Sequence, residues 1–139
     1  MKFSDFIKQG QVRVASKDES LAKSLMRSAK KDAEFLGSLE INEQSSRKLM
    51  TNYYDVLRSI LEAIAAIKGY KIYSHEAFAY FLEEKNEKVL SIKFDRFRKI
   101  RNSINYYGEN ISVEETKENI EEIKSMIKIL TDKYLGKLI

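Results

Sequence analysis

Residues 49–67 read LMTNYYDVLRSILEAIAAI, and this stretch decides the fold class. Its large apolar residues recur every three or four positions, which is the period of one face of an α-helix. These residues are Leu49, Tyr53, Val56, Leu57, Ile60, Leu61, Ile64 and Ile67. The stripe is wide, and Gly69 follows it where a helix stop is expected. We therefore predict a long, central and most buried helix over residues 45–68.

The same period predicts four further helices, over residues 16–37, 75–84, 88–107 and 113–135. Glycines stand at or just after the ends of three of them, where a left-handed helix cap is favoured. The chain has no proline to interrupt these segments. No stretch shows the strict alternation of a strand bounded by turn residues, so no strand is expected.

Serines mark the predicted helix starts. Ser16 with Glu19, and Ser112 with Glu115, have the spacing of a capping box, in which the two side chains satisfy each other's backbone N–H groups. Ser74 is the expected N-cap of the short third helix. These caps and the apolar stripes together predict an all-α fold, an up-and-down bundle of about five helices.

Composition narrows the class of protein. Of 139 residues, 43% are hydrophobic and 33% are charged, which suits a single folded domain over residues 1–139. The longest purely apolar run, Ala63–Ile67, is far shorter than the roughly 20 residues that cross a bilayer, and the first residues do not read as a signal peptide. There is no cysteine. We expect a cytoplasmic protein with no membrane contact.

The helix predicted over residues 88–107 has an uneven charge. Its basic residues crowd together with one acidic residue, Asp95, among them: they are Lys93, Arg96, Arg98, Lys99 and Arg101. On a helix, residues three and four apart are neighbours, so one face carries Arg98, Arg101, Asn102 and Asn105. With a formal net charge of +4, this face could attract a polyanion.

Arg101 is the central candidate because it lies beside the apolar seam, four residues after Phe97 and three before Ile104. In one interpretation its planar guanidinium binds a phosphate, while Asn102 and Asn105 orient a ribose or phosphate oxygen. In the other, Arg101 lies along the surface or pairs with a glutamate of the last helix, and the asparagines are merely solvated. Spacing leaves both open, and solvated charges are the commoner case.

The remaining candidates are His75 and the paired tyrosines Tyr106 and Tyr107. The tyrosines adjoin the arginine face and could stack on bases. His75, the single histidine, follows the expected N-cap Ser74, where the helix dipole keeps an imidazole neutral. It could line the same cleft, but we favour a role in fixing the turn. One histidine without a carboxylate pair is no metal site, and we expect neither a metal nor a cofactor.

Several stretches resemble the HEPN domain, the nucleotide-binding domain of higher eukaryotes and prokaryotes. They are NYYDVLRSILEAI at 52–64, KGYK at 68–71, SHEAF at 74–78 and RKIRNSINYYG at 98–108. With the flanking helices, the resemblance extends from about Asp18 to Leu135. It implies a helical bundle that commonly dimerises, and many members are encoded beside a small nucleotidyltransferase as toxin–antitoxin pairs.

The resemblance also implies a metal-independent RNase site across the dimer. In the family this site uses an arginine, the polar residue after it and a histidine a few positions later. Arg101 matches the arginine and Asn102 the polar residue, but Tyr106 stands at the histidine position. A tyrosine, with an ordinary pKa of about 10, is a poor general base at neutral pH. We therefore expect weak or absent nuclease activity.

These points predict a dimeric HEPN-type protein that binds a nucleotide or RNA phosphate and acts with a nucleotidyltransferase partner. The expected binding residues are Arg98, Arg101, Asn102, Asn105 and Tyr107. One alternative is an active RNase toxin whose catalytic residues are Arg101, Asn102 and Tyr106. Another is a non-enzymatic scaffold whose apolar stripe binds a partner protein.

Overall fold

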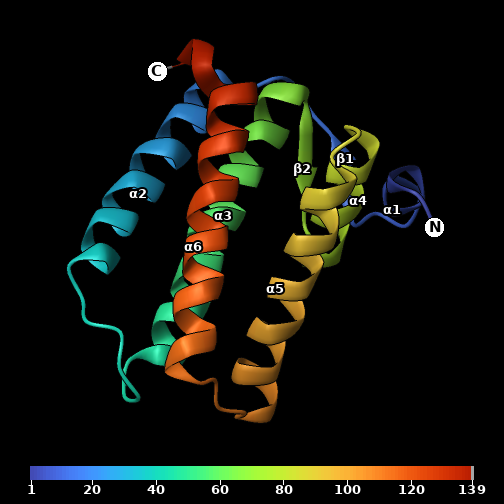
Figure 1. Ribbon diagram of the computed structural model, residues 1–139. Coiled ribbons are helices and arrows are strands. Elements are labelled where there is room, and N and C mark those ends of the chain that lie inside the picture. The colour runs from blue at the N-terminus through green and yellow to red at the C-terminus, as the bar shows by residue number, and fades with distance from the viewer. Residues whose placement is uncertain (139) are drawn as a thin grey trace.

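The computed structural model describes residues 1–138, most of which are helical. Figure 1 shows the elements in chain order. They are α1 (Phe3–Lys8), β1 (Val12–Val14), α2 (Glu19–Gly37), α3 (Ser46–Lys68), β2 (Tyr70–Ile72), α4 (His75–Glu84), α5 (Lys88–Tyr107) and α6 (Val113–Leu130). A π-helical turn, Thr131–Leu135, and a 3-10 turn, Gly136–Leu138, extend α6. The long helices alternate in direction, which confirms the predicted all-α bundle.

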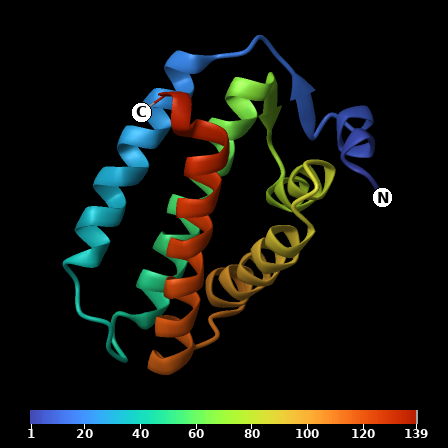
Figure 2. The same ribbon diagram turned by 45° about the horizontal axis from the view of Figure 1, so that its top comes forward.

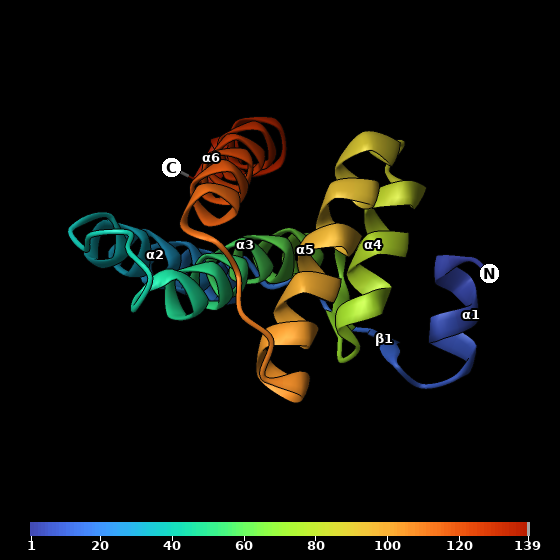
Figure 3. The same ribbon diagram turned by 60° about the horizontal axis from the view of Figure 1, so that its bottom comes forward.

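Helix α3 is the centre of the bundle, as its apolar stripe predicts. It packs against α2, α5, α6 and β2. Seen from the end in Figure 3, the helices α2, α3, α5 and α4 form a row, and α6 lies on one side of that row. Leu57 and Leu61 of α3 are 0% exposed. A wide apolar stripe was needed because α3 has neighbours on several sides.

Two short elements at the N-terminal end were not predicted. Helix α1 buries Phe3 and Phe6 against α4 and the core. Strand β1 pairs antiparallel with β2, with Val12 opposite Ile72. Each strand has three residues, which is too short for an alternating pattern to stand out in the sequence. The expectation that the chain has no strand was therefore wrong.

The predicted start of α2 was also wrong. The chain is still extended at Ala15, whose N–H donates to the Gly69 carbonyl 2.8 Å away. The helix begins at Glu19 instead, and the Asp18 carboxylate accepts from the N–H of Leu21 at 2.9 Å. The capping box at residue 16 does not form because Ser16 lies between two bonds that tie the extended segment to the end of α3, from the Ala15 N–H to the Gly69 carbonyl and from the Asp18 N–H to the Ala66 carbonyl.

The other helix ends agree more closely with the sequence. Ser112 caps α6 by accepting from the N–H of Glu115 at 3.0 Å. Ser74 is the N-cap of α4, although its side chain makes no capping bond. Gly136 has a right-handed φ of −56° and does not stop the helix, so the turns after α6 continue past it. Within residues 1–138, no helix is both long enough and apolar enough to cross a membrane.

Gly69 and Gly108 both end helices in the left-handed conformation, with φ of 88° and 65°. A Cβ on Gly69 would meet the Ala15 carbonyl oxygen at 3.0 Å, whereas one on Gly108 would meet nothing within 4 Å. We expect Gly108→Ala to cost about 1 kcal/mol of unfolding free energy and Gly69→Ala about 2 kcal/mol. Urea unfolding of both variants measures this difference. Equal losses would show that the backbone near Ala15 moves aside freely.

Candidate arginine site

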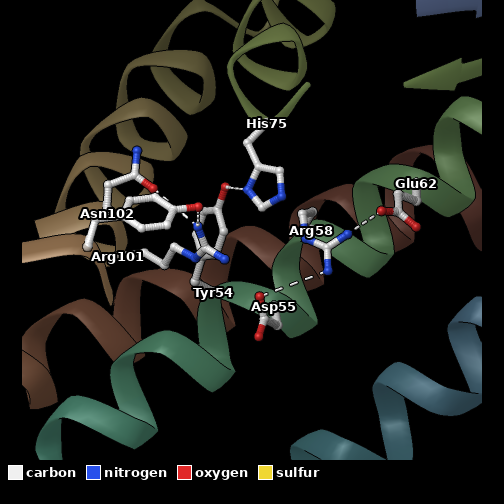
Figure 4. A network of polar contacts seen from close by, with 8 residues as sticks. Tyr54, Asp55, Arg58, Glu62, His75, Arg101 and Asn102 are labelled. Carbon is white, nitrogen blue, oxygen red and sulfur yellow. Dashed lines mark hydrogen bonds and ion pairs between the residues drawn. The ribbon is translucent and has the colours of Figure 1, made fainter. Parts of the chain in front are cut away.

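Three arginines converge where α3, α5 and the start of α4 meet, and we call Arg58, Arg98 and Arg101 the arginine cluster. Arg58 comes from α3, and Arg98 and Arg101 come from successive turns of α5. All three are close enough to act electrostatically on Tyr54 of α3 and on His75, the first residue of α4. Figure 4 shows Arg58, Tyr54, His75 and Arg101 beside one another.

Two members of the cluster have carboxylate partners. Arg58 pairs with Glu62 and lies 3.9 Å from Asp55. Arg98 donates to Asp95 from Nε at 2.9 Å, and its Nη2 is 2.8 Å from the same oxygen. Burial raises the pKa of Asp55, while nearby guanidinium groups lower it. Asp95 is also buried in part, but its bonds with Arg98 and Lys99 outweigh burial and lower its pKa. Glu62 and Asp95 therefore already have cationic partners, Arg58 for Glu62 and Arg98 with Lys99 for Asp95.

Arg101 differs because its partners are neutral. Its Nη1 donates to Asn102 Oδ1 at 3.2 Å and to the Tyr106 hydroxyl at 3.1 Å. The guanidinium also lies over two rings, 5.9 Å from the centre of Tyr54 and 5.4 Å from that of Tyr106. Its Nε is buried without a hydrogen-bond partner. Within residues 1–138, no carboxylate forms an ion pair with Arg101.

The glutamate pairing that sequence spacing allowed for Arg101 is made by Arg96 instead. Arg96 pairs with Glu122 of α6 and donates to Asn119 Oδ1 at 2.8 Å. It can do so because its side of α5 faces α6, while Arg101 lies over the ring of Tyr54 on α3. The interpretation of Arg101 as partner of the last helix was therefore wrong.

His75 lines the cluster through Tyr54. The Tyr54 hydroxyl is 3.0 Å from His75 Nδ1, and the two rings are stacked with centres 5.8 Å apart. Burial lowers the pKa of His75 to about 4, with further lowering by Arg58, Arg101 and Arg98. Burial also raises the pKa of Tyr54, which keeps its O–H available as a donor. A neutral imidazole that accepts at Nδ1 carries its proton on Nε2.

The structure thus brings together Arg98, Arg101, Asn102 and Tyr106 of the predicted site residues. Asn105 and Tyr107 are exposed, and no side-chain hydrogen bond among the described residues joins them to the cluster. Two contributors were missed, Tyr54 and Arg58. Both lie within the stretch that predicts the central helix. They are four residues apart, so the sequence could have predicted that their polar groups lie side by side on one face of that helix.

The lowered pKa of His75 predicts a pH-dependent stability. Between about pH 6.5 and pH 4 the unfolded chain binds a proton that the folded protein does not. The unfolding free energy should therefore fall as the pH is lowered through this range, by on the order of 2 kcal/mol for a partly buried ring, and level off below it. Urea unfolding of wild type and His75→Gln at a series of pH values measures this term. Parallel pH profiles would contradict the assignment.

The described part of the chain has no group of three or more histidine, aspartate or glutamate side chains placed to hold an ion. Comparison with known proteins adds no assignment: no protein-family model matches the chain, and searches of curated proteins and of solved structures find no significant match. The functional argument therefore depends on the geometry of the arginine cluster.

Proposed function

We propose that this protein binds RNA or a nucleotide through a phosphate at the arginine cluster, with Arg101 as the phosphate clamp and Asn102 orienting it. The observation that carries the proposal is the unpaired charge of Arg101. Its guanidinium is partly buried and its hydrogen-bond partners are neutral, because Glu62 pairs with Arg58, Asp95 pairs with Arg98 and Lys99, and Asp55 is close enough to feel the charge of Arg101 but forms no ion pair with it. A phosphate offers the charge and the two oxygens that a guanidinium fork prefers.

The surroundings of Arg101 favour a nucleotide over a free phosphate. Tyr106 lies 5.4 Å from the Arg101 guanidinium and is 68% exposed, and Tyr107, the next residue at the end of α5, is 78% exposed. Exposed aromatic rings beside a cation are typical of surfaces on which bases stack, since every base has a π face. Asn105 is also exposed on this stretch and can donate or accept a hydrogen bond to a sugar or base.

The acid–base groups of the site support binding more than cleavage. An efficient general base has a pKa near the working pH. The pKa of His75 is about 4, and the pKa of Tyr54 is raised above its ordinary value, so neither is matched to proton transfer at neutral pH. An RNase activity that uses Arg101 and Tyr106 is the second candidate, favoured by the 3.1 Å bond between them.

The resemblance to HEPN domains extends this proposal to assembly. It supports a homodimer that acts with a small nucleotidyltransferase in a toxin–antitoxin-like pair. Mass determination in solution, with and without RNA, tests the dimer separately from phosphate binding.

The test is a paired assay of labelled RNA and labelled ATP against wild type, Arg101→Ala and Arg13→Ala. Arg13 is an exposed guanidinium on β1 outside the cluster, so its variant loses the same charge. We expect wild-type binding that weakens with salt, a loss of at least about tenfold in Arg101→Ala, and little change in Arg13→Ala.

The same incubations report on cleavage. We expect intact RNA with all three proteins over hours. RNA cleavage that disappears in Arg101→Ala would make the protein a nuclease despite Tyr106. Equal binding of RNA and ATP by wild type and Arg101→Ala would contradict the assignment of Arg101 to the binding site. Failure to bind any polyanion, even at low salt, would leave the protein-binding scaffold as the remaining account.

A further inference from the structure

A second surface feature is a groove of about 720 Å³ between α2 and α6, whose lining includes no residue of the arginine cluster. Both helices pack against α3, and Figure 2 shows them with α3 behind. Val56 and Ile60 of α3 lie at its floor. Residues of α2, α3 and α6 therefore line the groove, which is large enough for part of another polypeptide segment to bind between α2 and α6.

The inner surface of this groove is apolar. Met26, Ala29 and Ala33 of α2 form one wall, and Ile127 of α6 and Leu138 form the other. Met26, Ala33, Ile127 and Leu138 are only partly buried by the rest of the chain. Ala29 and Ala33 have short side chains one turn apart, so the α2 backbone is accessible from the groove at this point. A second helix could approach such a surface closely.

The rim of the groove is basic. Lys23, Arg27 and Lys30 follow one another at spacings of four and three, so they form a row along one edge of α2, and Lys124 of α6 also lines the groove. None of the three α2 residues forms an ion pair with another described residue, and Lys124 is 3.8 Å from Glu121. Glu34 is the one acidic residue among the lining residues.

We propose that this groove binds an amphipathic helix of a partner protein, with its apolar stripe on the floor and acidic residues along the basic row. Peptide helices dock in apolar grooves through residues at helical spacing, and the row from Lys23 to Lys30 runs about two turns, or roughly 10 Å. The unpaired cations supply the charge complementarity. A symmetric dimer through this groove is disfavoured because it would bring basic rows together.

The probe for this proposal is a fluorescent peptide of about 18 residues with leucines at helical spacing and glutamates on both flanks. Two control peptides have lysine in place of glutamate, or the same composition in scrambled order. Binding is measured by anisotropy at several salt concentrations, and the site is mapped from backbone amide shifts in NMR spectra. We expect saturable, salt-sensitive binding of the glutamate peptide alone, with shifts confined to α2, α6 and the floor of α3.

Two variants and one charge-matched control test the lining residues. Lys23→Glu, Arg27→Glu and Lys30→Glu combined should weaken the glutamate peptide at least about tenfold, whereas Lys8→Glu, Lys71→Glu and Lys117→Glu combined have the same net charge and should retain binding. Ala33→Phe should weaken binding by filling the groove without changing charge, with circular dichroism checking the fold.

Several outcomes overturn the proposal. They are equal binding of the lysine or scrambled peptide, shifts that map elsewhere, equal effects of the two triple variants, and no saturable binding of the glutamate peptide up to millimolar concentration at low salt. Binding to phosphatidylserine vesicles in place of the peptide would assign the groove to a membrane surface and also overturn it.

Discussion

Replacing Arg101 with methionine should weaken RNA binding at least about tenfold and, at the same time, raise the unfolding free energy by about 1 kcal/mol. The gain is expected because the buried Nε has no hydrogen-bond partner and the guanidinium forms no ion pair with a carboxylate of the described residues. Methionine keeps an unbranched side chain that can pack on the ring of Tyr54. Urea unfolding and RNA binding on the same preparation measure both effects.

The matched control is Arg98→Met on the same helix. Arg98 binds Asp95, so its loss should lower stability by about 0.5–1 kcal/mol and leave Asp95 with Lys99 alone. Opposite signs for the two variants would mark Arg101 as a residue kept for a ligand at a cost in stability. A loss of stability in both would mean that Arg101 is an ordinary structural residue.

Phe94→Ala should have the largest effect on folding, a loss of about 3–5 kcal/mol. Phe94 is 0% exposed, stacks on Tyr54 with ring centres 5.4 Å apart, and meets Phe78 edge-on at 6.0 Å. Its removal leaves a cavity between α3, α4 and α5, beneath the arginine cluster. Thermal and urea unfolding measure the loss.

Phe35→Ala is the control for this prediction, because Phe35 on α2 is 64% exposed. Its removal should change the unfolding free energy by less than about 0.5 kcal/mol. Similar losses in the two variants would contradict the packing described for the core, since they would place Phe35 and Phe94 in equally buried surroundings.

The sequence was most informative where periodicity is long. The stripe from Leu49 to Ile67 predicted α3 and its central place, and the glycines at 69 and 108 marked the ends of α3 and α5. A helix of many turns repeats its apolar spacing often enough to be recognised. The positions of these helices and of their ends depend on residues near one another in the chain, so the sequence alone was enough to predict them.

The errors arose where distant contacts decide local structure. Residue 16 has the spacing of a helix cap, yet the bond from Ala15 to Gly69 keeps this segment extended, and the helix begins after Asp18. Strands β1 and β2 stabilise each other although they are far apart in the sequence, as the pairing of Val12 with Ile72 shows. No pattern within either segment reports that pairing.

For the site, the sequence predicted a shared face on α5 but not its surroundings. The contacts of Arg101 with Asn102 and Tyr106 lie within one helix, but they join residues one and five apart, which the spacing of three and four did not predict. The stacking of Tyr54 on His75 joins α3 to α4, and the ion pair of Arg96 with Glu122 joins α5 to α6. Those depend on how the helices pack, which one sequence does not determine.

The most direct test of phosphate binding at Arg101 is an NMR titration that follows the arginine Nε–Hε resonances while RNA is added. Assignment comes from Arg101→Lys, Arg58→Lys, Arg27→Lys and Arg13→Lys variants. We expect the Arg101 resonance to shift and saturate with RNA, the Arg58 resonance to follow it, and the Arg13 resonance to stay in place. RNA binding that leaves the Arg101 resonance unchanged and shifts Arg27 on α2 instead would contradict the account.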